Sequence, residues 1–259
     1  MTRARPFEPH PDAKSGRVGL IVAELQTVHW GHVRLMTEMA GSCDTGILAI
    51  GSTQLHGIEG HPFSFDQRKD MVQAIFGQQF KTLPLQDIDA SIETGDWLKY
   101  VLSRIASASL PAPTDYFTGS AIDARFYTEY FAGLEDPSIS NGPVRTFSSK
   151  NRDRRLHIVD RASSLTLSGR EIRHLIEARD PEWRNYVPAR LWNYIERHYP
   201  PHLRTAIKTG GEMPADVPVG TRCLAGNDPT VLVLRDDGKW RPLRDIGVEK
   251  AGHRRVGVP

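Results

Sequence analysis

The chain of 259 residues and 29.0 kDa is long enough for one large domain, or for a domain of about 200 residues with an appendage. Its 39% apolar and 25% charged residues exclude a disordered or fibrous chain. The net charge of +2, from 33 Lys and Arg against 31 Asp and Glu, excludes a general electrostatic attraction to nucleic acid or to an anionic membrane.

The sequence has no apolar stretch near the roughly 18 residues that a membrane-spanning helix needs, and no apolar region follows its charged N-terminus. We therefore expect a cytoplasmic protein that makes no contact with a membrane. The two cysteines, Cys43 and Cys223, lie far apart and have no histidine pair beside them. A disulfide framework and a zinc ribbon are not expected.

Residues 1–17 have no periodic apolar pattern, and we expect a mobile N-terminal arm there. Residues 18–23 and 46–50 are short continuous apolar runs, which are typical of strands covered on both faces. Residues 32–39 between them have a helical composition, so the first 50 residues predict a β-α-β unit.

The alternation continues along the chain. Strands are predicted at residues 81–85, 116–119 and 144–147, and helices at residues 65–76, 94–106 and 121–131. Strands that alternate with helices predict an α/β fold with an open, doubly wound parallel sheet (Rossmann-like). Such sheets bind ligands in the crevice outside the carboxyl ends of their strands, so the site should lie at strand-to-helix turns.

The C-terminal half has a different composition. A long basic loop is expected at residues 148–161. One helix is then expected to begin near residue 168, and a second to cover residues 183–197. We expect residues 210–259 to form a linker and a small C-terminal extension with β structure, to which the sequence assigns no role. Within them, residues 230–234 and 239–243 predict a hairpin joined by an Asp-Gly turn.

The first candidate site is His29-Trp30-Gly31-His32, where the first strand gives way to the first helix. A helix N-terminus attracts anions, and two histidines three residues apart lie on the same face of the first turn. Gly31 has no Cβ atom to keep a phosphate away from the backbone. This pattern predicts a phosphate site; the alternatives are two hydrogen-bonded histidines at a helix start, or a metal site with further ligands elsewhere.

The second candidate is Ser168-Gly169-Arg170, followed by Arg173, at the start of a late helix. A serine N-cap and two arginines three residues apart could hold a polyphosphate, although the same pattern also describes an ordinary capped and solvated helix. Trp97, in a predicted amphipathic helix, would by itself be assigned to the core.

Several of these motifs together resemble the nicotinamide mononucleotide (NMN) adenylyltransferases, especially those of archaeal type, within the nucleotidyltransferase superfamily. They occur in the family's order: His29 to His32, Ile50-Gly-Ser-Thr-Gln54, His61-Pro-Phe-Ser-Phe-Asp-Gln-Arg68, Trp97, and Ser168 to Arg173. The family pattern has Asn-Pro-Phe-Thr before the arginine of the third motif. The resemblance covers about residues 17–205, and it implies a nucleotidyltransferase domain over residues 18–205.

The resemblance implies transfer of the adenylyl group of ATP to NMN, which gives NAD and pyrophosphate without a covalent enzyme intermediate. It implies Mg²⁺ carried with ATP, and it assigns no metal ligand to the protein. It implies the following site residues: catalytic His29, His32, Arg173 and Arg68; ATP-binding Gln26, Gly31, Ser168, Gly169 and Arg170; NMN-binding Trp97, Ser52 and Gln54.

Two positions depart from the family pattern. Glu24 stands where the family has an arginine after the first strand, and Arg170 stands where the late motif usually has a threonine. A carboxylate near a triphosphate is repulsive. We therefore expect Glu24 and Arg170 to pair across the ATP site, so that the arginine restores the missing positive charge.

Other functions on the same fold remain open. The acceptor could be nicotinic acid mononucleotide or another phosphate, with adenylyl or cytidylyl transfer, because a few side chains decide the substrate. A catalytically impaired nucleotide-sensing or nucleic-acid-binding protein is a further alternative. Residues 145–173 hold eight Arg and Lys against three acids, which a solvated loop beside a polyphosphate explains more simply than RNA. The expected partners are ATP and a nucleotide monophosphate, and the sequence allows a homo-oligomer.

Overall fold

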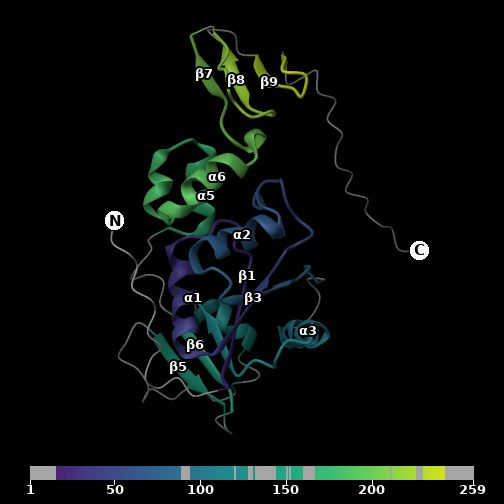
Figure 1. Ribbon diagram of the computed structural model, residues 1–259, viewed down its shortest axis with the longest axis vertical. Coiled ribbons are helices and arrows are strands. Elements are labelled where there is room, and N and C mark those ends of the chain that lie inside the picture. Colours follow the sequence, from purple (N-terminus) through teal and green to yellow (C-terminus); the bar gives the residue numbers. More distant parts are fainter. Residues whose placement is uncertain are drawn as a thin grey trace, which may run out of the picture. The chain divides into compact units, whose positions relative to one another are not determined.

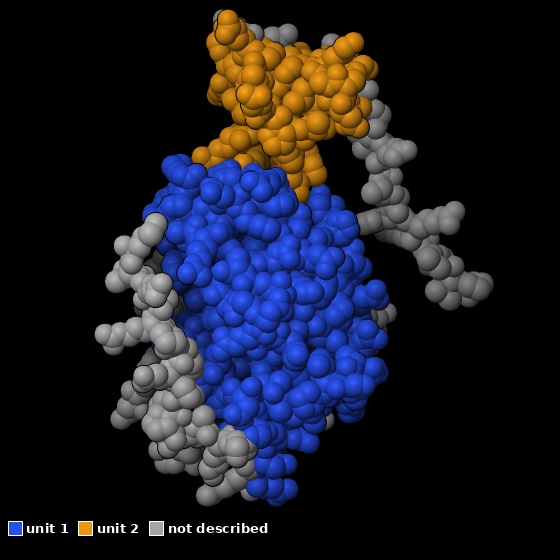
Figure 2. Space-filling view, in the orientation of Figure 1, with its two compact units in different colours: residues 1–175, 180–199 blue, residues 176–179, 200–259 orange. Residues whose placement is uncertain are grey.

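The computed structural model describes residues 16–88, 94–119, 121–127, 131, 144–149, 151, 153–159, 167–210, 212–225 and 230–242 (Figure 1). Most of the predicted N-terminal arm lies outside these residues. The chain divides into two compact units, residues 1–175 with 180–199 and residues 176–179 with 200–259 (Figure 2). Each unit is described by itself.

The first unit holds a six-stranded sheet with strand order β3-β2-β1-β4-β6-β5. Its strands are β1 (Val18–Ala23), β2 (Thr45–Ile50), β3 (Phe80–Pro84), β4 (Asp115–Thr118), β5 (Val144–Ser148) and β6 (Arg155–Val159). Its longer helices are α1 (Trp30–Ser42), α2 (Phe65–Phe76) and α3 (Thr94–Ser107). All strand pairs are parallel except β5 with β6. The predicted doubly wound α/β fold is confirmed.

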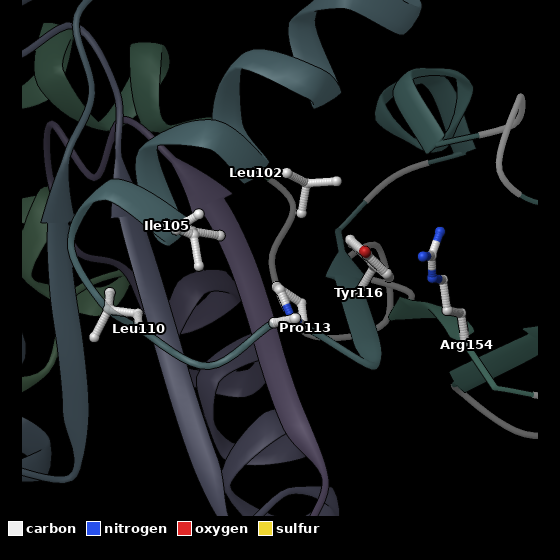
Figure 3. A pocket seen from close by; sticks show the side chains of 8 residues that line it. Leu102, Ile105, Leu110, Pro113, Tyr116 and Arg154 are labelled. Atoms are coloured by element: carbon white, nitrogen blue, oxygen red, sulfur yellow. The ribbon is translucent and has the colours of Figure 1, made fainter.

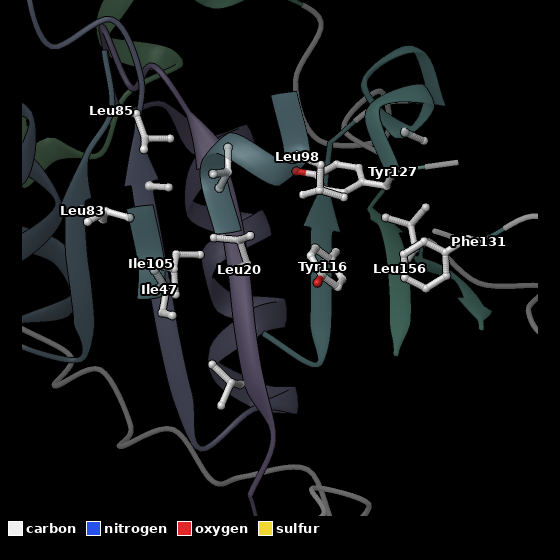
Figure 4. Close-up of a cluster of buried hydrophobic side chains, with 14 of the residues drawn as sticks. Leu20, Ile47, Leu83, Leu85, Leu98, Ile105, Tyr116, Tyr127, Phe131 and Leu156 are labelled. Carbon is white, nitrogen blue, oxygen red and sulfur yellow. The ribbon is translucent and has the colours of Figure 1, made fainter. Parts of the chain in front are cut away.

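Alternating side chains of the strands explain why helices cover both faces. Leu20 of β1 and Tyr116 of β4 belong to one buried cluster with Leu98 and Ile105 of α3 (Figure 4). The preceding residue of β1, Gly19, faces the opposite side, where a Cβ atom would lie only 2.5 Å from Met39 Cγ of α1. Glycine therefore allows α1 to approach the sheet closely, and α1 and α3 lie on opposite faces (Figure 1).

The predicted loop at residues 148–161 is wrong, because β6 lies within it. Its basic and polar composition hid a strand whose polar member, His157, is buried. His157 Nε2 lies 2.8 Å from Asp115 Oδ1, and its ring stacks on Phe117 at 4.3 Å. A buried polar side chain that has hydrogen-bond partners is compatible with a central strand.

Two predicted helices are shorter than expected. Residues 183–197 form 3₁₀ turns at Pro181–Asn185 and Ala189–Leu191 before α6 (Trp192–His198). Pro188 separates them, since proline lacks an N–H group and disfavours a helical residue before it. Residues 121–131 contain α4 (Ala121–Ala124) and a 3₁₀ turn at Arg125–Tyr127, while 128–130 lie outside the described residues. The late helix α5 spans Gly169–Glu177.

The second unit holds a four-stranded sheet with order β10-β9-β8-β7. Its strands are β7 (Ile207–Thr209), β8 (Arg222–Ala225), β9 (Val231–Leu234) and β10 (Trp240–Pro242). The predicted hairpin is confirmed as the antiparallel pair β9–β10, and Gly238 has the positive φ, 74°, that its turn requires. Residues 210–259 also contain β8, a strand that was not predicted individually, and a 3₁₀ turn at Pro201–Leu203 precedes the sheet.

A cavity of about 160 Å³ lies between α3 and the start of β4 (Figure 3). Leu102, Ile105, Pro113 and Tyr116 line it, with Arg154 beside them. These residues mark the amino ends of β4 and β6, so the cavity lies at the edge opposite the expected nucleotide site. Within the described part of the chain, no helix is long and apolar enough to cross a membrane.

Candidate active site

The turn between β1 and α1 brings the two histidines together as their spacing predicts. His29 is the N-cap residue of α1 and is only 2% exposed. The rings of His29 and His32 stack with centroids 3.8 Å apart, and the His29 backbone N–H points to His32 Nδ1 at 3.5 Å. The Trp30 N–H donates to the Tyr186 carbonyl at 3.0 Å, so the protein itself satisfies part of this helix start.

The start of α5 converges on the same place. A Cβ atom at Gly169 would lie 3.5 Å from His29 Nε2 and 3.6 Å from Arg173 Nη1. Two motifs that lie about 140 residues apart in the sequence therefore meet at the carboxyl ends of the strands, where doubly wound sheets bind ligands. Glycine keeps the space between the imidazole and the guanidinium free of a side chain.

Ser168 caps α5, as expected for an ordinary capped helix rather than a phosphate site. Its hydroxyl donates to Glu171 Oε2 at 2.7 Å, and the Glu171 backbone N–H donates to that hydroxyl at 3.3 Å. The hydrogen bonds from Ser168, first that of its backbone N–H, hold the pKa of the Glu171 carboxyl below its usual value. A phosphate at Ser168 would have to replace Glu171. Arg170, in the first turn of α5, is exposed.

Arg68 of α2 is fully buried, and its guanidinium is hydrogen-bonded to the backbone just after β1 and β2. Its guanidinium donates to the carbonyls of Glu24 at 2.6 Å, Gly51 at 2.7 Å, Ser64 at 3.2 Å and Ser52 at 3.4 Å. Burial lowers the pKa of Arg68 to about 10, although the charges of Glu24 and Asp87 act in the opposite direction. This geometry does not support the predicted contact with a phosphate; it makes Arg68 a link between β1, β2 and α2.

Ser52 and Gln54, at the end of β2, both hold one carboxylate that the sequence analysis did not select. Ser52 Oγ donates to Asp87 Oδ1 and Gln54 Nε2 donates to Asp87 Oδ2, each at 2.8 Å. Asp87 follows β3 and is exposed. An acidic residue a few positions after a parallel strand, at the carboxyl edge of the sheet, is the signal that could have identified it.

Gln26 is 2% exposed, and its Oε1 accepts a hydrogen bond from the Phe63 backbone N–H at 3.1 Å. Its predicted role was binding of ATP. The side chain instead fixes the β1–α1 loop to the segment before α2. Its buried Nε2 has no hydrogen-bond partner among the described residues.

Glu24 does not pair with Arg170, so the predicted coupling between them is not found. The Glu24 carboxylate lies 3.7 Å from His61 Nε2, and the Glu24 Cγ atom would be 3.9 Å from a Cβ atom at Gly51. The Glu24 side chain thus points past Gly51, just after β2, towards the segment that contains His61. Both Glu24 and His61 stand at positions where the family pattern has another residue.

Trp97, on α3, is half-buried. Its ring lies 5.1 Å from the Phe126 ring and 6.0 Å from the Tyr127 ring, at the margin of the core cluster. Trp97 therefore packs against the core, as expected for an apolar residue of an amphipathic helix, while part of its surface remains accessible.

No group of three or more His, Cys, Asp or Glu side chains in the described ranges is placed to hold a metal ion. Magnesium usually keeps several waters and binds through substrate phosphates, so a Mg²⁺ ion that arrives with ATP fits this arrangement.

Curated proteins and solved structures were compared with this chain. The nicotinamide-nucleotide adenylyltransferase of Pyrococcus horikoshii is 26% identical over 183 residues, which cover 69% of this chain and 82% of that protein. The enzyme of the same name from Methanospirillum hungatei is 27% identical over 180 residues, 68% of this chain and 86% of that protein. No family model matches.

The solved bifunctional NMN adenylyltransferase/ADP-ribose pyrophosphatase of Francisella tularensis has a TM-score of 0.38 and 18% identity, and the match covers 44% of this chain and 34% of that one. The sequence relatives show that the chain is a distant homologue of the archaeal nicotinamide-nucleotide adenylyltransferases, 26% to 27% identical to them over 68% to 69% of its length.

Proposed function

We propose that this protein transfers the adenylyl group of ATP to nicotinamide mononucleotide, and that residues 18–205 carry the activity. The observation that supports this most directly is the convergence of His29 and His32 with Gly169 and Arg173 at the carboxyl ends of the strands. Imidazole and guanidinium groups on either side of a glycine suit a polyphosphate. The homologous enzymes carry this activity in their names.

In the proposed reaction, a phosphate oxygen of NMN forms a bond to the α-phosphorus of ATP. The bond from that phosphorus to the bridging oxygen breaks, and pyrophosphate leaves with the electron pair. The attacking phosphate is already ionised at neutral pH, so no general base is required. The protein mainly positions two polyanions and offsets the charge that develops on the leaving group.

Each residue then has a role that its contacts allow. His29, His32 and Arg173 hold the triphosphate, Arg170 is a nearby exposed cation, and Gly31 and Gly169 leave room for phosphate oxygens. Mg²⁺ bound to ATP supplies further charge neutralisation. Ser168 contacts ATP only if Glu171 gives way.

On the acceptor side, Ser52 and Gln54 act through Asp87 as positioning residues, and the accessible part of Trp97 stacks on the nicotinamide ring. Arg68 and Gln26 hold the loops that carry these groups. Ser52, Gln54 and Asp87 thus sit on the short segments after β2 and β3, and buried hydrogen bonds of Arg68 and Gln26 hold the neighbouring backbone.

The test is to incubate the purified protein with ATP, Mg²⁺ and NMN and to measure NAD and pyrophosphate together. We expect both products in equal amounts, and we expect His29→Ala and His32→Ala each to lower kcat by about a hundredfold or more, while the lost His29 N-cap costs no more than about 2 kcal/mol of unfolding free energy. Variants with wild-type rates would contradict the site. ATP binding without turnover would favour a nucleotide sensor on this fold.

A further inference from the structure

The two sides of the candidate active site differ in charge. On one side, His29, His32, Arg170 and Arg173 lie at the starts of α1 and α5, with Glu171 as the acid among them. On the other, the segments that follow β1, β2 and β3, residues 24–28, 51–64 and 85–88, contain no Lys or Arg and contain Glu24, Glu59 and Asp87. Arg68, which donates to the Glu24 and Gly51 carbonyls of these segments, is fully buried.

Glu24 is the exposed carboxylate at the carboxyl end of β1. It follows the last residue of β1 directly, and its side chain is 55% exposed. Its carbonyl is held by Arg68 at 2.6 Å, and its carboxylate lies 3.7 Å from His61 Nε2. A charge at the carboxyl end of the central strand lies at the crevice where such sheets bind ligands. It acts on any ligand group within about 8 Å, the screening length at physiological salt.

We propose that Glu24 determines acceptor specificity by disfavouring acceptors that carry an additional negative charge. This inference rests on the proposed adenylyl transfer and specifies its acceptor class: a pyridinium nucleotide with a neutral carboxamide rather than one with a carboxylate. The pyridinium ring is cationic and the carboxamide is neutral, so only the acid form adds a charge of the same sign as Glu24. A like charge several ångströms away in a partly solvated site is worth about tenfold in relative affinity.

The test compares NMN with nicotinic acid mononucleotide in the wild type and in Glu24→Gln. Because the side chain is largely exposed, the isosteric amide should fold normally. We expect kcat/KM for the acid acceptor to rise about tenfold relative to that for NMN. Glu24→Asp, which keeps the charge, should keep the wild-type ratio within about twofold.

Glu38→Gln is the matched control, since it removes one carboxylate from α1 about 12 Å along the helix from its start. The same shift in ratio in Glu38→Gln, or an unchanged ratio in Glu24→Gln, would overturn the proposal. If the wild type converts neither acceptor, the proposed adenylyl transfer fails, and calorimetric binding of the two nucleotides then decides. A relative affinity that Glu24→Gln changes would still support charge selection, while equal affinities or no binding of either nucleotide would overturn it.

Discussion

Gly169 is the residue at which the late helix meets the first histidine, and its missing side chain is itself a feature of the site. A Cβ atom there would make ordinary van der Waals contact with His29, so alanine fits without steric clash. The methyl group would nevertheless occupy the space between His29 Nε2 and Arg173 Nη1.

We therefore predict that Gly169→Ala weakens ATP binding by about tenfold or more and leaves stability unchanged or raised by up to about 1 kcal/mol, because alanine favours the helix. Calorimetric titration with ATP and urea unfolding measure the two effects. Gly210→Ala is the control, since no atom lies within 4 Å of its Cβ position. Unchanged ATP affinity in Gly169→Ala would place the phosphates elsewhere.

Arg68 is the residue whose family role and observed contacts differ most. Removing a buried cation that serves four carbonyls leaves those acceptors unsatisfied. We predict that Arg68→Met lowers the unfolding free energy by about 3 to 5 kcal/mol. Lys69→Met, on the same helix but only partly buried, should cost less than about 1 kcal/mol in urea unfolding. A stable but inactive Arg68→Met protein would instead indicate a direct contact with substrate.

Sequence patterns could identify the chemistry of individual residues, but not their hydrogen-bond partners. The spacing of His29 and His32 on a first helical turn was enough to predict that their side chains come together. Nothing in the sequence distinguishes an arginine that binds phosphate from one that binds backbone carbonyls, since both need the same donors. For the same reason, Glu24 was paired with Arg170, whereas the structure pairs it with His61.

At the scale of elements, β1 and β2, which have continuous apolar runs, were predictable, whereas β6, whose His157 makes a buried hydrogen bond to Asp115, was not. β1 and β2 contain only apolar residues, glycine and one threonine, so their pattern is unambiguous. β6 carries Arg155 and His157, and its place in the sheet depends on partners in other strands. A contact between distant segments leaves no periodic signal along the chain.

Asp115 of β4 has a buried carboxylate that is hydrogen-bonded to His157 of β6, and it predicts how stability depends on pH. Burial raises the pKa of Asp115, but hydrogen bonds from His157, Arg17 and Thr114 outweigh it and hold the pKa below its ordinary value. A lowered folded-state pKa contributes stability above the unfolded-state value of about 3.9, and this contribution is lost as the pH falls through the folded-state value.

We therefore predict that Asp115→Asn is less stable than the wild type at pH 6 and loses less unfolding free energy between about pH 5 and pH 3. Urea unfolding at several pH values measures both. Asp96→Asn, at an exposed site of α3, should follow the wild-type curve. Parallel curves for Asp115→Asn and the wild type would show that this carboxylate does not contribute to acid sensitivity.

At the scale of the whole molecule, the two sheets are built from separate stretches of chain. All strands of the six-stranded sheet precede residue 160, and β7 to β10 pair only with one another among the described strands. The candidate active-site residues lie between positions 24 and 173, within the first unit. The core that supports them also includes Leu191, Ile195 and Tyr199, which are at most 1% exposed.

We therefore predict that a chain ending at residue 205 folds, retains its thermal midpoint within about 5 °C, and keeps the adenylyl transfer activity within about threefold. A chain ending at residue 179 should fail to fold, because it loses those three buried side chains, and Tyr199 also contacts the ring of Phe63 with centroids 5.5 Å apart. Circular dichroism melting and the NAD assay compare both chains with the full-length protein. Loss of activity in a folded chain ending at 205 would give the C-terminal sheet a role in the reaction, and an unfolded one would show that the nucleotidyltransferase domain extends beyond residue 205.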